Sequence, residues 1–143
     1  MGKRIAILQS NYIPWKGYFD LIRQVDEFIF YDEVQYTKND WRNRNKIKSP
    51  AGVQWITVPV RYQFPQKISD TLVSSKDWAD KHWKTLSLNY ARAPYFKMYK
   101  DAFGDLYHSD LTDHISVINR KAIELINSLV GIKTKISSSV DFD

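Results

Sequence analysis

The first thirty residues place a helical stripe between two apolar runs, and this pattern limits the folds that the chain can adopt. Residues 4–9 and 28–31 are short apolar runs with polar or acidic neighbours, as expected of buried strands. Between them, residues 17–25 set apolar side chains at offsets of three, four and seven, and Pro14 limits how early this helix begins. Because a helical crossover joins parallel strands, we predict that the two strands lie side by side and parallel.

The remainder of the chain continues these two periods. A third strand is predicted near Pro59, which favours an edge position. Three amphipathic helices follow, and the last is expected to be capped by Asp110 or Thr112 and to end at Gly131. The predicted elements are a strand at 53–60, helices at 78–91, 95–107 and 112–130, and a strand at 132–136. We predict one α/β domain over residues 1–143, Rossmann-like, with a mostly parallel sheet and flanking helices.

Composition excludes several classes of protein. The 143 residues suit one compact domain. The apolar runs are too short to span a bilayer, and the run before Gln9 is too short for a signal peptide, so we predict a cytoplasmic protein without membrane insertion. The absence of cysteine excludes disulfides and thiolate catalysis. The formal charge is +5, and much of the excess lies between Tyr36 and Lys48, where Asp40 is the single acid.

The turn after the first strand combines an amide, a cation and aromatic rings. In open α/β sheets ligands bind beyond the carboxyl ends of the strands, and a helix that begins there offers free N–H groups to an anion. We predict that Gln9 and Lys16 contact a ligand, with Lys16 adding positive charge. The rings of Tyr12, Trp15 and Tyr18 can stack on a base or a sugar. The alternative is that Trp15 and Tyr18 only wedge the helix onto the sheet.

Two acids, Asp32 and Glu33, directly follow the second predicted strand and lie at the same predicted edge. An acid at this place can bind a ribose or sugar hydroxyl, hold a divalent cation or act as a general base. The commoner outcome for such acids is a surface loop. We predict Asp32 as a catalytic residue.

The segment at residues 35–48 alternates basic and amide side chains around aromatic ones. Arginine offers a planar fork for phosphate or carboxylate, and asparagine supplies both a donor and an acceptor. This mixture favours a binding role over a purely solvated loop. The residues predicted to bind a ligand are Gln35, Tyr36, Lys38, Trp41, Arg42, Asn43 and Arg44.

The three histidines, His82, His108 and His114, do not have the spacing of metal ligands, so no metal site is predicted from them. His82 lies among the apolar positions of a predicted helix, which favours a packed side chain. It becomes a pocket residue if that helix faces the first turn. Glycine-rich phosphate loops and nucleophile elbows are absent from the sequence.

Two stretches, AILQSNYIPWKGYFD at 6–20 and DEVQYTKNDWRNRN at 32–45, resemble the WbqC-like protein family. The resemblance extends through WITVPV at 55–60, Trp78, His82 and YARAPYF at 90–96, and so covers nearly the whole chain. Members are often encoded with enzymes of surface-polysaccharide biosynthesis. The resemblance therefore implies a transferase that acts on a nucleotide-linked sugar or its amino-sugar precursor.

The same family normally continues with a Tyr-Leu-Ser-Gly-like turn and more helices, so the resemblance implies that a C-terminal segment of the family is missing here. Without it, the apolar strand at 132–136 would lack a cover, and exposed apolar patches mark contact surfaces. We expect a homo-oligomer interface, or a mobile C-terminus, near residues 126–142.

More loosely, the first turn is similar to that of nucleotidyltransferases, in which it carries His-x-Gly-His. Trp15 and Tyr18 replace both histidines here, and neither can make a cationic contact to a leaving phosphate.

The first functional hypothesis is a group transferase whose ligand is an anionic small molecule, a nucleotide or nucleotide-sugar, with or without a divalent cation. The catalytic residues would be Asp32, Lys16 and Arg42. Lys16 and Arg42, with Arg44, would offset developing negative charge, and Asp32 would orient a hydroxyl or amine or act as base. Trp41 would stack on the ligand together with the rings of the first turn.

We also predict that Gln9, Tyr12, Asp32 and Arg42 line one cleft. Two other hypotheses remain open. One is a nucleic-acid-binding module that uses the same basic and aromatic segment. The other is a non-catalytic assembly factor.

Overall fold

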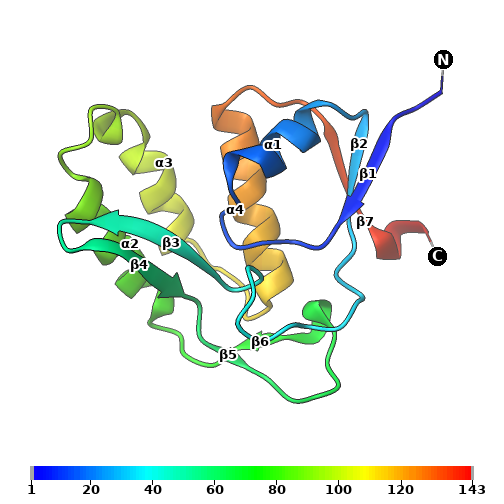
Figure 1. Cartoon of the computed structure of the whole chain (residues 1–143), viewed down its shortest axis with the longest axis horizontal. Coiled ribbons are helices and arrows are strands. Elements are labelled where there is room, and N and C mark those ends of the chain that lie inside the picture. The colour runs from blue at the N-terminus through cyan, green and yellow to red at the C-terminus, as the bar shows by residue number, and fades with distance from the viewer. Residues whose placement is uncertain (1, 143) are drawn as a thin grey trace.

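The computed structural model describes residues 2–142 and shows a mixed α/β fold. Its four helices and its strands are arranged as two parts that share the long helix α4 (Figure 1). In chain order the elements are β1 (Ile5–Leu8), α1 (Lys16–Arg23), β2 (Glu27–Phe30), β3 (Arg44–Ser49), β4 (Gly52–Thr57), β5 (Val60–Arg61), η1 (Ile68–Asp70), β6 (Leu72–Val73), α2 (Trp78–Tyr90), α3 (Phe96–His108), α4 (Ile115–Leu129), β7 (Lys135–Ser138) and η2 (Ser139–Phe142).

The first part is a three-stranded parallel sheet in the order β1-β2-β7. In its register Ile5 pairs with Glu27, and Glu27 pairs with Lys135. The predicted parallel pairing of the first two strands is confirmed, and helix α1 joins them as expected. The carboxyl ends of β1 and β2 therefore meet at one edge of the sheet. The last strand, β7, begins at Lys135, three residues after the start of the strand predicted at 132–136.

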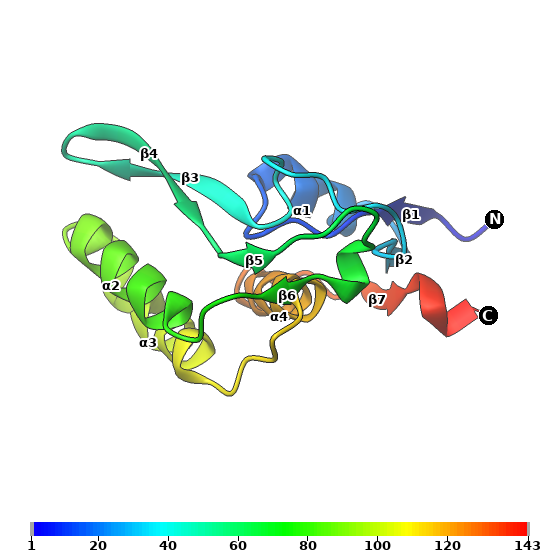
Figure 2. The same cartoon turned by 90° about the horizontal axis from the view of Figure 1, so that it is seen from below.

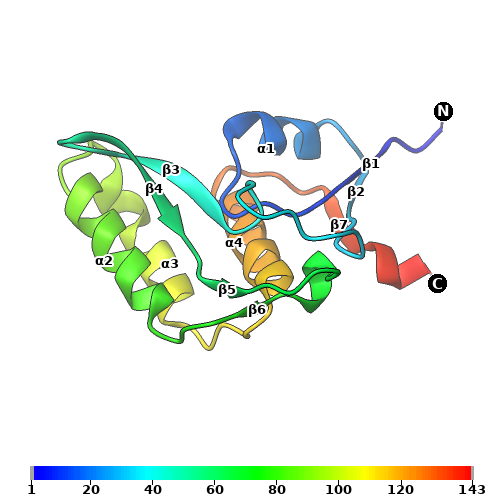
Figure 3. The ribbon, with the colours of Figure 1, turned by 60° about the horizontal axis from the view of Figure 1, so that its bottom comes forward.

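Helices α1 and α4 both cover the same face of this sheet (Figure 3). Tyr18 and Ile22 of α1 and Ile123 of α4 pack with Phe28 and Phe30 of β2 in one buried cluster. A Rossmann-like sheet has helices on both faces. The structure supports a small parallel sheet with flanking helices and does not confirm a Rossmann or nucleotidyltransferase fold.

The opposite face of the sheet carries a charged cluster. Glu27, only 2% exposed, accepts hydrogen bonds from Lys3 and Ser137 and pairs with Lys135 at 3.1 Å. These bonds, with that of Lys3 first, lower the pKa of Glu27 to about 2. On the same face Ile7 is 58% exposed. The charge of Glu27 is therefore compensated by two lysines, and the face remains partly apolar.

The second part contains a long hairpin that the sequence predicts only in half. β3 pairs with β4 in an antiparallel sheet of its own, with Arg44 opposite Thr57 and Ser49 opposite Gly52. The strand predicted at 53–60 is divided because Pro59 lies between β4 and β5, where it cannot donate a backbone hydrogen bond. β3 is missed because its alternate positions are basic and one position between them is Asn45. Apolar and polar side chains therefore do not alternate along it in the way that predicts a strand.

Helices α2 and α3 lie against the hairpin (Figure 2). The predicted helices at 78–91 and 95–107 are confirmed within one residue at each end. Helix α4 begins at Ile115 rather than 112, and its N-cap is His114, without a side-chain cap bond. The predicted caps are therefore wrong. The predicted end is confirmed at Gly131, whose φ of +75° is the left-handed conformation that terminates helices.

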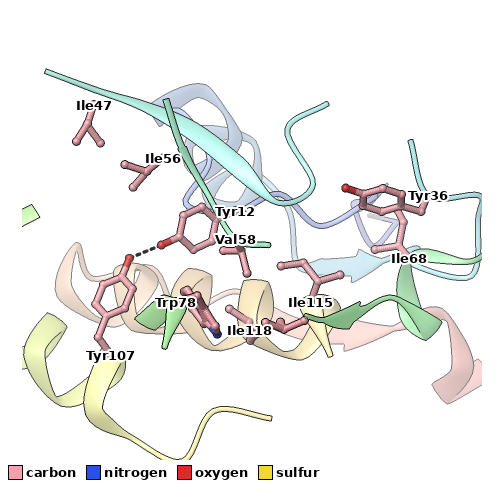
Figure 4. Packing of buried hydrophobic residues seen from close by; sticks show 11 residues of the cluster. Tyr12, Tyr36, Ile47, Ile56, Val58, Ile68, Trp78, Tyr107, Ile115 and Ile118 are labelled. Atoms are coloured by element: carbon pink, nitrogen blue, oxygen red, sulfur yellow. Dashed lines mark hydrogen bonds between the residues drawn. The ribbon is translucent and has the colours of Figure 1, made fainter. Parts of the chain in front are cut away.

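Helix α4 joins the two parts because it contributes to both cores. Its first turns place Ile115 and Ile118 in a cluster with residues of the hairpin and of α2 (Figure 4). Further along, Ile123 belongs to the cluster below the parallel sheet.

The chain after α4 leaves several apolar side chains exposed. Val130, Val140 and Phe142 are 61%, 54% and 59% exposed, and Ile132 and Ile136 are half-buried. The self-association expected near 126–142 stays a prediction. Within residues 2–142 no helix has the length and apolar character that a membrane crossing requires.

Candidate functional site

The turn between β1 and α1 is held in a strained conformation. Ile13 has a φ of +42°, in the left-handed region that β-branched residues avoid. The side-chain amide of Asn45, on β3, donates to the carbonyl of Ile13 and to that of Tyr12, the latter at 3.3 Å. Strain of this kind persists where the surroundings fix it, and it gathers at binding sites. The hairpin therefore fixes the shape of this turn.

A network of buried hydrogen bonds joins the start of the turn to the end of β2 and to α4. The carboxylate of Asp32 accepts the backbone N–H of Ser10 at 2.8 Å and its hydroxyl at 2.7 Å. From α4, Asn119 donates to Ser10 Oγ at 3.0 Å. Burial raises the pKa of Asp32, against the opposing effects of the Ser10 bonds and of Arg42. Asp32 thus ties the ends of β1 and β2 together.

The segment at 41–45 is bound directly to the turn. The backbone N–H of Tyr12 donates to the carbonyl of Trp41 at 3.0 Å. The guanidinium of Arg42 donates to Asn11 Oδ1 and lies 3.7 Å from an Asp40 carboxylate oxygen. The carbonyl of Arg42 accepts from the side chain of Asn119 at 2.8 Å. The turn and the segment are therefore one rigid unit.

This unit encloses a hollow of about 350 Å³. The first turn and the second segment form its two walls, with one exposed tryptophan from each, Trp15 at 71% and Trp41 at 44%. We call it the polar hollow, and it is lined by Asn11, Pro14, Trp15, Trp41, Asn45 and Lys46.

Trp15 owes its position to Gly17. The indole ring lies over the Cα atom of Gly17, and a Cβ at position 17 would collide with the ring. A glycine is needed here because of this close approach and not because of a special φ. The sequence Trp-Lys-Gly therefore sets a flat aromatic surface at the start of α1.

A second hollow of about 410 Å³ lies between the hairpin and the helices α2 and α3. We call it the aromatic hollow, and it is lined by Tyr12, Ile13, Pro14, Trp15, Asn45, Lys46, Ile47, Ile56, Trp83, Leu86, Tyr90, Phe96 and Phe103. Pro14, Trp15, Asn45 and Lys46 line both hollows.

A buried chain of hydrogen bonds anchors Tyr12 beneath these hollows. His82 Nε2 lies 3.0 Å from the carbonyl of Thr57, which can only accept, so Nε2 carries the proton. His82 Nδ1 then accepts from the hydroxyl of Tyr12 at 2.8 Å, and Tyr107 donates to Tyr12 at 2.5 Å (Figure 4). Burial lowers the pKa of His82, which favours this neutral form. His82 is thus a packed histidine that holds the turn.

Several predicted site residues have structural contacts instead. The Tyr18 hydroxyl donates to the carbonyl of Gln9 at 2.8 Å, so this ring wedges α1 onto the sheet. Gln35 donates to the carbonyl of Tyr36 at 3.0 Å, and the ring of Tyr36 is buried against Tyr62. The structure does not bring these side chains to either hollow.

The other predicted residues lie around the hairpin. Asn43 is buried and donates to the carbonyl of Val58 at 2.8 Å. Arg44 lies on the outer face of the hairpin, with its guanidinium 4.1 Å from the ring centroid of Trp55. Lys16 lines a separate hollow that also includes Trp15, and Lys38 is exposed.

Among the hollows described for residues 2–142, none is lined by Gln9, Tyr12, Asp32 and Arg42 together, as the prediction of a single cleft requires. Tyr12 lines the aromatic hollow, whereas Asp32 lines a different cavity of about 210 Å³ at the end of β2. Asp32 lies near enough to Arg42 for the guanidinium to act on its pKa, but both of its carboxylate oxygens are held by Ser10 and its side chain lines the other cavity. Within residues 2–142 no group of three or more His, Asp or Glu side chains is placed to hold a metal ion.

Sequence reasoning missed four of the residues that line the polar hollow, Asn11, Pro14, Asn45 and Lys46, and the α2 and α3 residues of the aromatic hollow. Asn45 and Lys46 lie inside the stretch that it selected, but their roles depend on the pairing of β3 with β4. The strand alternation sets Asn45 toward the turn and Lys46 beside Trp55. The alternating polar and basic letters from Asn43 to Lys48 were the available signal.

The fold and these hollows define a mixed α/β protein with an aromatic-walled hollow beside a small parallel sheet. The chain belongs to the WbqC-like protein family, whose model matches residues 9–143. It is 50% identical over 143 residues to "Uncharacterized protein Rv1507c" of Mycobacterium tuberculosis (strain ATCC 25618 / H37Rv). That match covers 99% of this chain and 62% of the relative, so the chain spans less than two thirds of the relative's length. No solved structure matches the chain.

Proposed function

We propose that this protein is a group transferase that acts on a nucleotide, nucleotide-sugar or amino-sugar precursor in surface-polysaccharide biosynthesis. Membership of the WbqC-like family supports the proposal through the genetic neighbourhood that the resemblance implies. The observation that carries it is the polar hollow, in which two exposed tryptophans, two asparagines and a lysine converge. The relative is longer than this chain, and the proposal also covers the activity of a whole protein of that length.

The polar hollow has the groups that a sugar ring requires. Exposed indole faces bind the apolar face of a ring, and Trp15 and Trp41 supply one from each wall. Because Asn11 Oδ1 accepts from Arg42, its NH₂ group is left as a donor for a hydroxyl. Such polar groups fix the orientation of a ligand between apolar walls.

The positive charge of the site comes from Lys46 in this proposal. The guanidinium of Arg42 is engaged by Asn11 and lies near Asp40, so it positions the wall and does not line the hollow. Asp32 likewise acts as a positioning residue, since both of its oxygens hold Ser10. Lys16 lies one residue beyond Trp15 and can add charge at the outer rim.

The test is calorimetric titration of the chain with nucleoside diphosphates and their hexose esters. We expect saturable binding, and Trp41→Ala to weaken the binding of the hexose esters by about tenfold, the loss of one stacking contact of about 1–3 kcal/mol. Trp55→Ala is the matched control because Trp55 is also exposed, at 42%, and adjoins Trp41 but does not line the hollow. Absence of binding to every compound of the panel would refute the proposal.

A second candidate function, nucleic-acid binding, is favoured by the outer face of the hairpin. The strand register places Arg44, Lys46 and Lys48 on the same face as Trp55. Interleaved cations and rings of this kind bind single strands. This candidate predicts oligonucleotide affinity that falls steeply with salt and is reduced by Trp55→Ala as much as by Trp41→Ala. The transferase proposal predicts an effect of Trp41→Ala alone.

A further inference from the structure

The aromatic hollow is not used by the function proposed above, and its lining differs from that of the polar hollow. Trp83, Leu86 and Tyr90 of α2 and Phe96 and Phe103 of α3 are all half-buried, so their side chains are partly open to a ligand. Trp83 stacks on Phe96 with ring centroids 6.2 Å apart and an interplanar angle of 19°. The two rings therefore pack on each other and form one aromatic wall of the hollow.

Few polar groups of this hollow remain for a ligand. The hydroxyl of Tyr12 is engaged by His82 and Tyr107. The hydroxyl of Tyr90 accepts the backbone N–H of Lys48 at 3.0 Å, which leaves its proton as a donor. Aromatic walls with a hydroxyl donor suit a flat heterocycle that carries an acceptor at its edge.

The two hollows adjoin each other along one boundary. Pro14 and Trp15 from the turn, and Asn45 and Lys46 from β3, line both. The two hollows are therefore adjacent, and the Lys46 ammonium, which lies 5.0 Å from the ring centroid of Trp55, is the cation nearest to both along the chain of β3. The strained Ile13, held by Asn45, also borders the aromatic hollow, so the boundary is part of the fixed turn.

We infer that the two hollows are two subsites for one ligand, a nucleoside diphosphate joined to a sugar. The base enters the aromatic hollow and lies against the rings of α2 and α3. The diphosphate lies at the shared boundary near Lys46, and the sugar occupies the polar hollow between Trp15 and Trp41. This inference rests on the proposed function and adds the orientation of the substrate.

The experiment compares two kinds of ligand, free nucleoside diphosphates and their hexose esters, on three forms of the protein. UDP, GDP and dTDP, and a hexose ester of each, are titrated by calorimetry into the native chain, Phe96→Ala and Trp41→Ala. Phe96→Ala should weaken the diphosphate and its sugar ester by the same factor, about tenfold, because both place the base in the aromatic hollow. Trp41→Ala should weaken the sugar ester alone.

Two further variants secure the interpretation. Tyr95→Ala is the matched control for Phe96→Ala, because Tyr95 is the adjacent aromatic residue, is 68% exposed and does not line the hollow. Tyr90→Phe keeps the aromatic ring and removes the hydroxyl donor, so it tests the aromatic hollow if Phe96→Ala fails to fold. It should weaken both ligands, and a thermal melt near that of the native chain confirms its fold.

The possible results separate the two proposals. If the native chain binds the sugar esters but neither Phe96→Ala nor Tyr90→Phe weakens the diphosphates, the orientation is wrong and the proposed function stands. If Trp41→Ala weakens the free diphosphates and Phe96→Ala only the esters, the ligand lies in the reverse direction and the inference is again refuted. If the native chain binds no compound of the panel, both proposals fail.

Discussion

The two parts of the molecule differ in how their interiors are filled. Around the parallel sheet, Phe28, Phe30 and Ile22 form a dry apolar cluster in which each side chain is at most 3% exposed. Around the hairpin, the core includes the hydroxyls of Tyr12 and Tyr107, and the hollows open above it. A close-packed interior leaves no space for a ligand, whereas an interior with polar ends and open slots can admit one. The sheet is thus a scaffold, and the hairpin part carries the candidate site.

Helix α4 determines whether this difference also divides the stability of the molecule. It contributes Ile118 to the hairpin core and Ile123 to the sheet core, five residues apart on one rigid helix. A helix shared in this way favours one cooperative unfolding transition for both parts. The tryptophans lie in the first turn, the hairpin and α2, so their fluorescence reports on the hairpin side.

The largest effect is expected from Phe28→Ala, in the centre of the sheet core. Removal of this fully buried ring should cost about 3–5 kcal/mol of unfolding free energy, through lost burial and the cavity left behind. Urea unfolding followed by tryptophan fluorescence and by circular dichroism should show the same lowered midpoint. Val53→Ala, at a site that is 71% exposed, should change the stability by less than about 0.5 kcal/mol. Two separate midpoints for Phe28→Ala would show that the parts unfold independently.

The next effect concerns the polar core of the hairpin part. Replacement of His82 by Ala leaves the Tyr12 hydroxyl without its acceptor, at a cost of about 1–3 kcal/mol for the buried group. Because burial lowers the pKa of His82 in the folded state, the proton binds more tightly to the unfolded state. The stability contributed by neutral His82 is therefore present above the unfolded histidine pKa of about 6.5 and decreases as the pH falls through and below it.

The measurement is the unfolding free energy at intervals from pH 8 to pH 5. The native chain should lose stability over this range, and His82→Ala should lose less. His108→Gln provides the control, because it removes a histidine that is exposed. An unaltered profile in His82→Ala would contradict the assignment of a buried neutral histidine.

A smaller effect is expected from Asn45→Ala, which releases the strained turn. The variant removes the bonds to the carbonyls of Tyr12 and Ile13, at a cost of about 1 kcal/mol. Asn89→Ala is a suitable control because the Asn89 amide bonds only the carbonyl of Thr85 within its own helix. Ligand affinity should fall in Asn45→Ala and persist in Asn89→Ala. Equal affinities in the two variants would show that the strain of Ile13 is not part of the site.

The contrast between the sheet part and the hairpin part also explains what could be predicted from the sequence. Apolar periodicity located β1, α1, β2 and the three later helices, because these elements bury one continuous stripe or face. It failed at β3, where the buried face holds Asn45 and Ile47 and the exposed face holds basic residues. The first turn and the segment at 35–48, which the sequence selects, supply the lining of the polar hollow, whereas the aromatic hollow also includes residues of α2 and α3. The partners of Asp32 and Arg42 depend on α4 and on the turn, and no local pattern indicates such long-range contacts.

The smallest change in stability, and the sharpest test of the site, is expected from Gly17→Ala. A methyl group at this position displaces the ring of Trp15, which is exposed and can rotate into solvent. The helical preference of alanine over glycine, about 0.5–1 kcal/mol, opposes the cost of that movement, so the unfolding free energy should stay within about 1 kcal/mol of the native value. Ligand affinity should nevertheless fall about as far as in Trp15→Ala, because in both variants the indole no longer forms the wall shared by the two hollows. Calorimetric titration beside a urea melt measures both quantities on one sample. Native affinity in Gly17→Ala together with a loss in Trp15→Ala would mean that the ring still reaches its ligand after it moves, and the close approach of Trp15 to Gly17 would then have no part in binding.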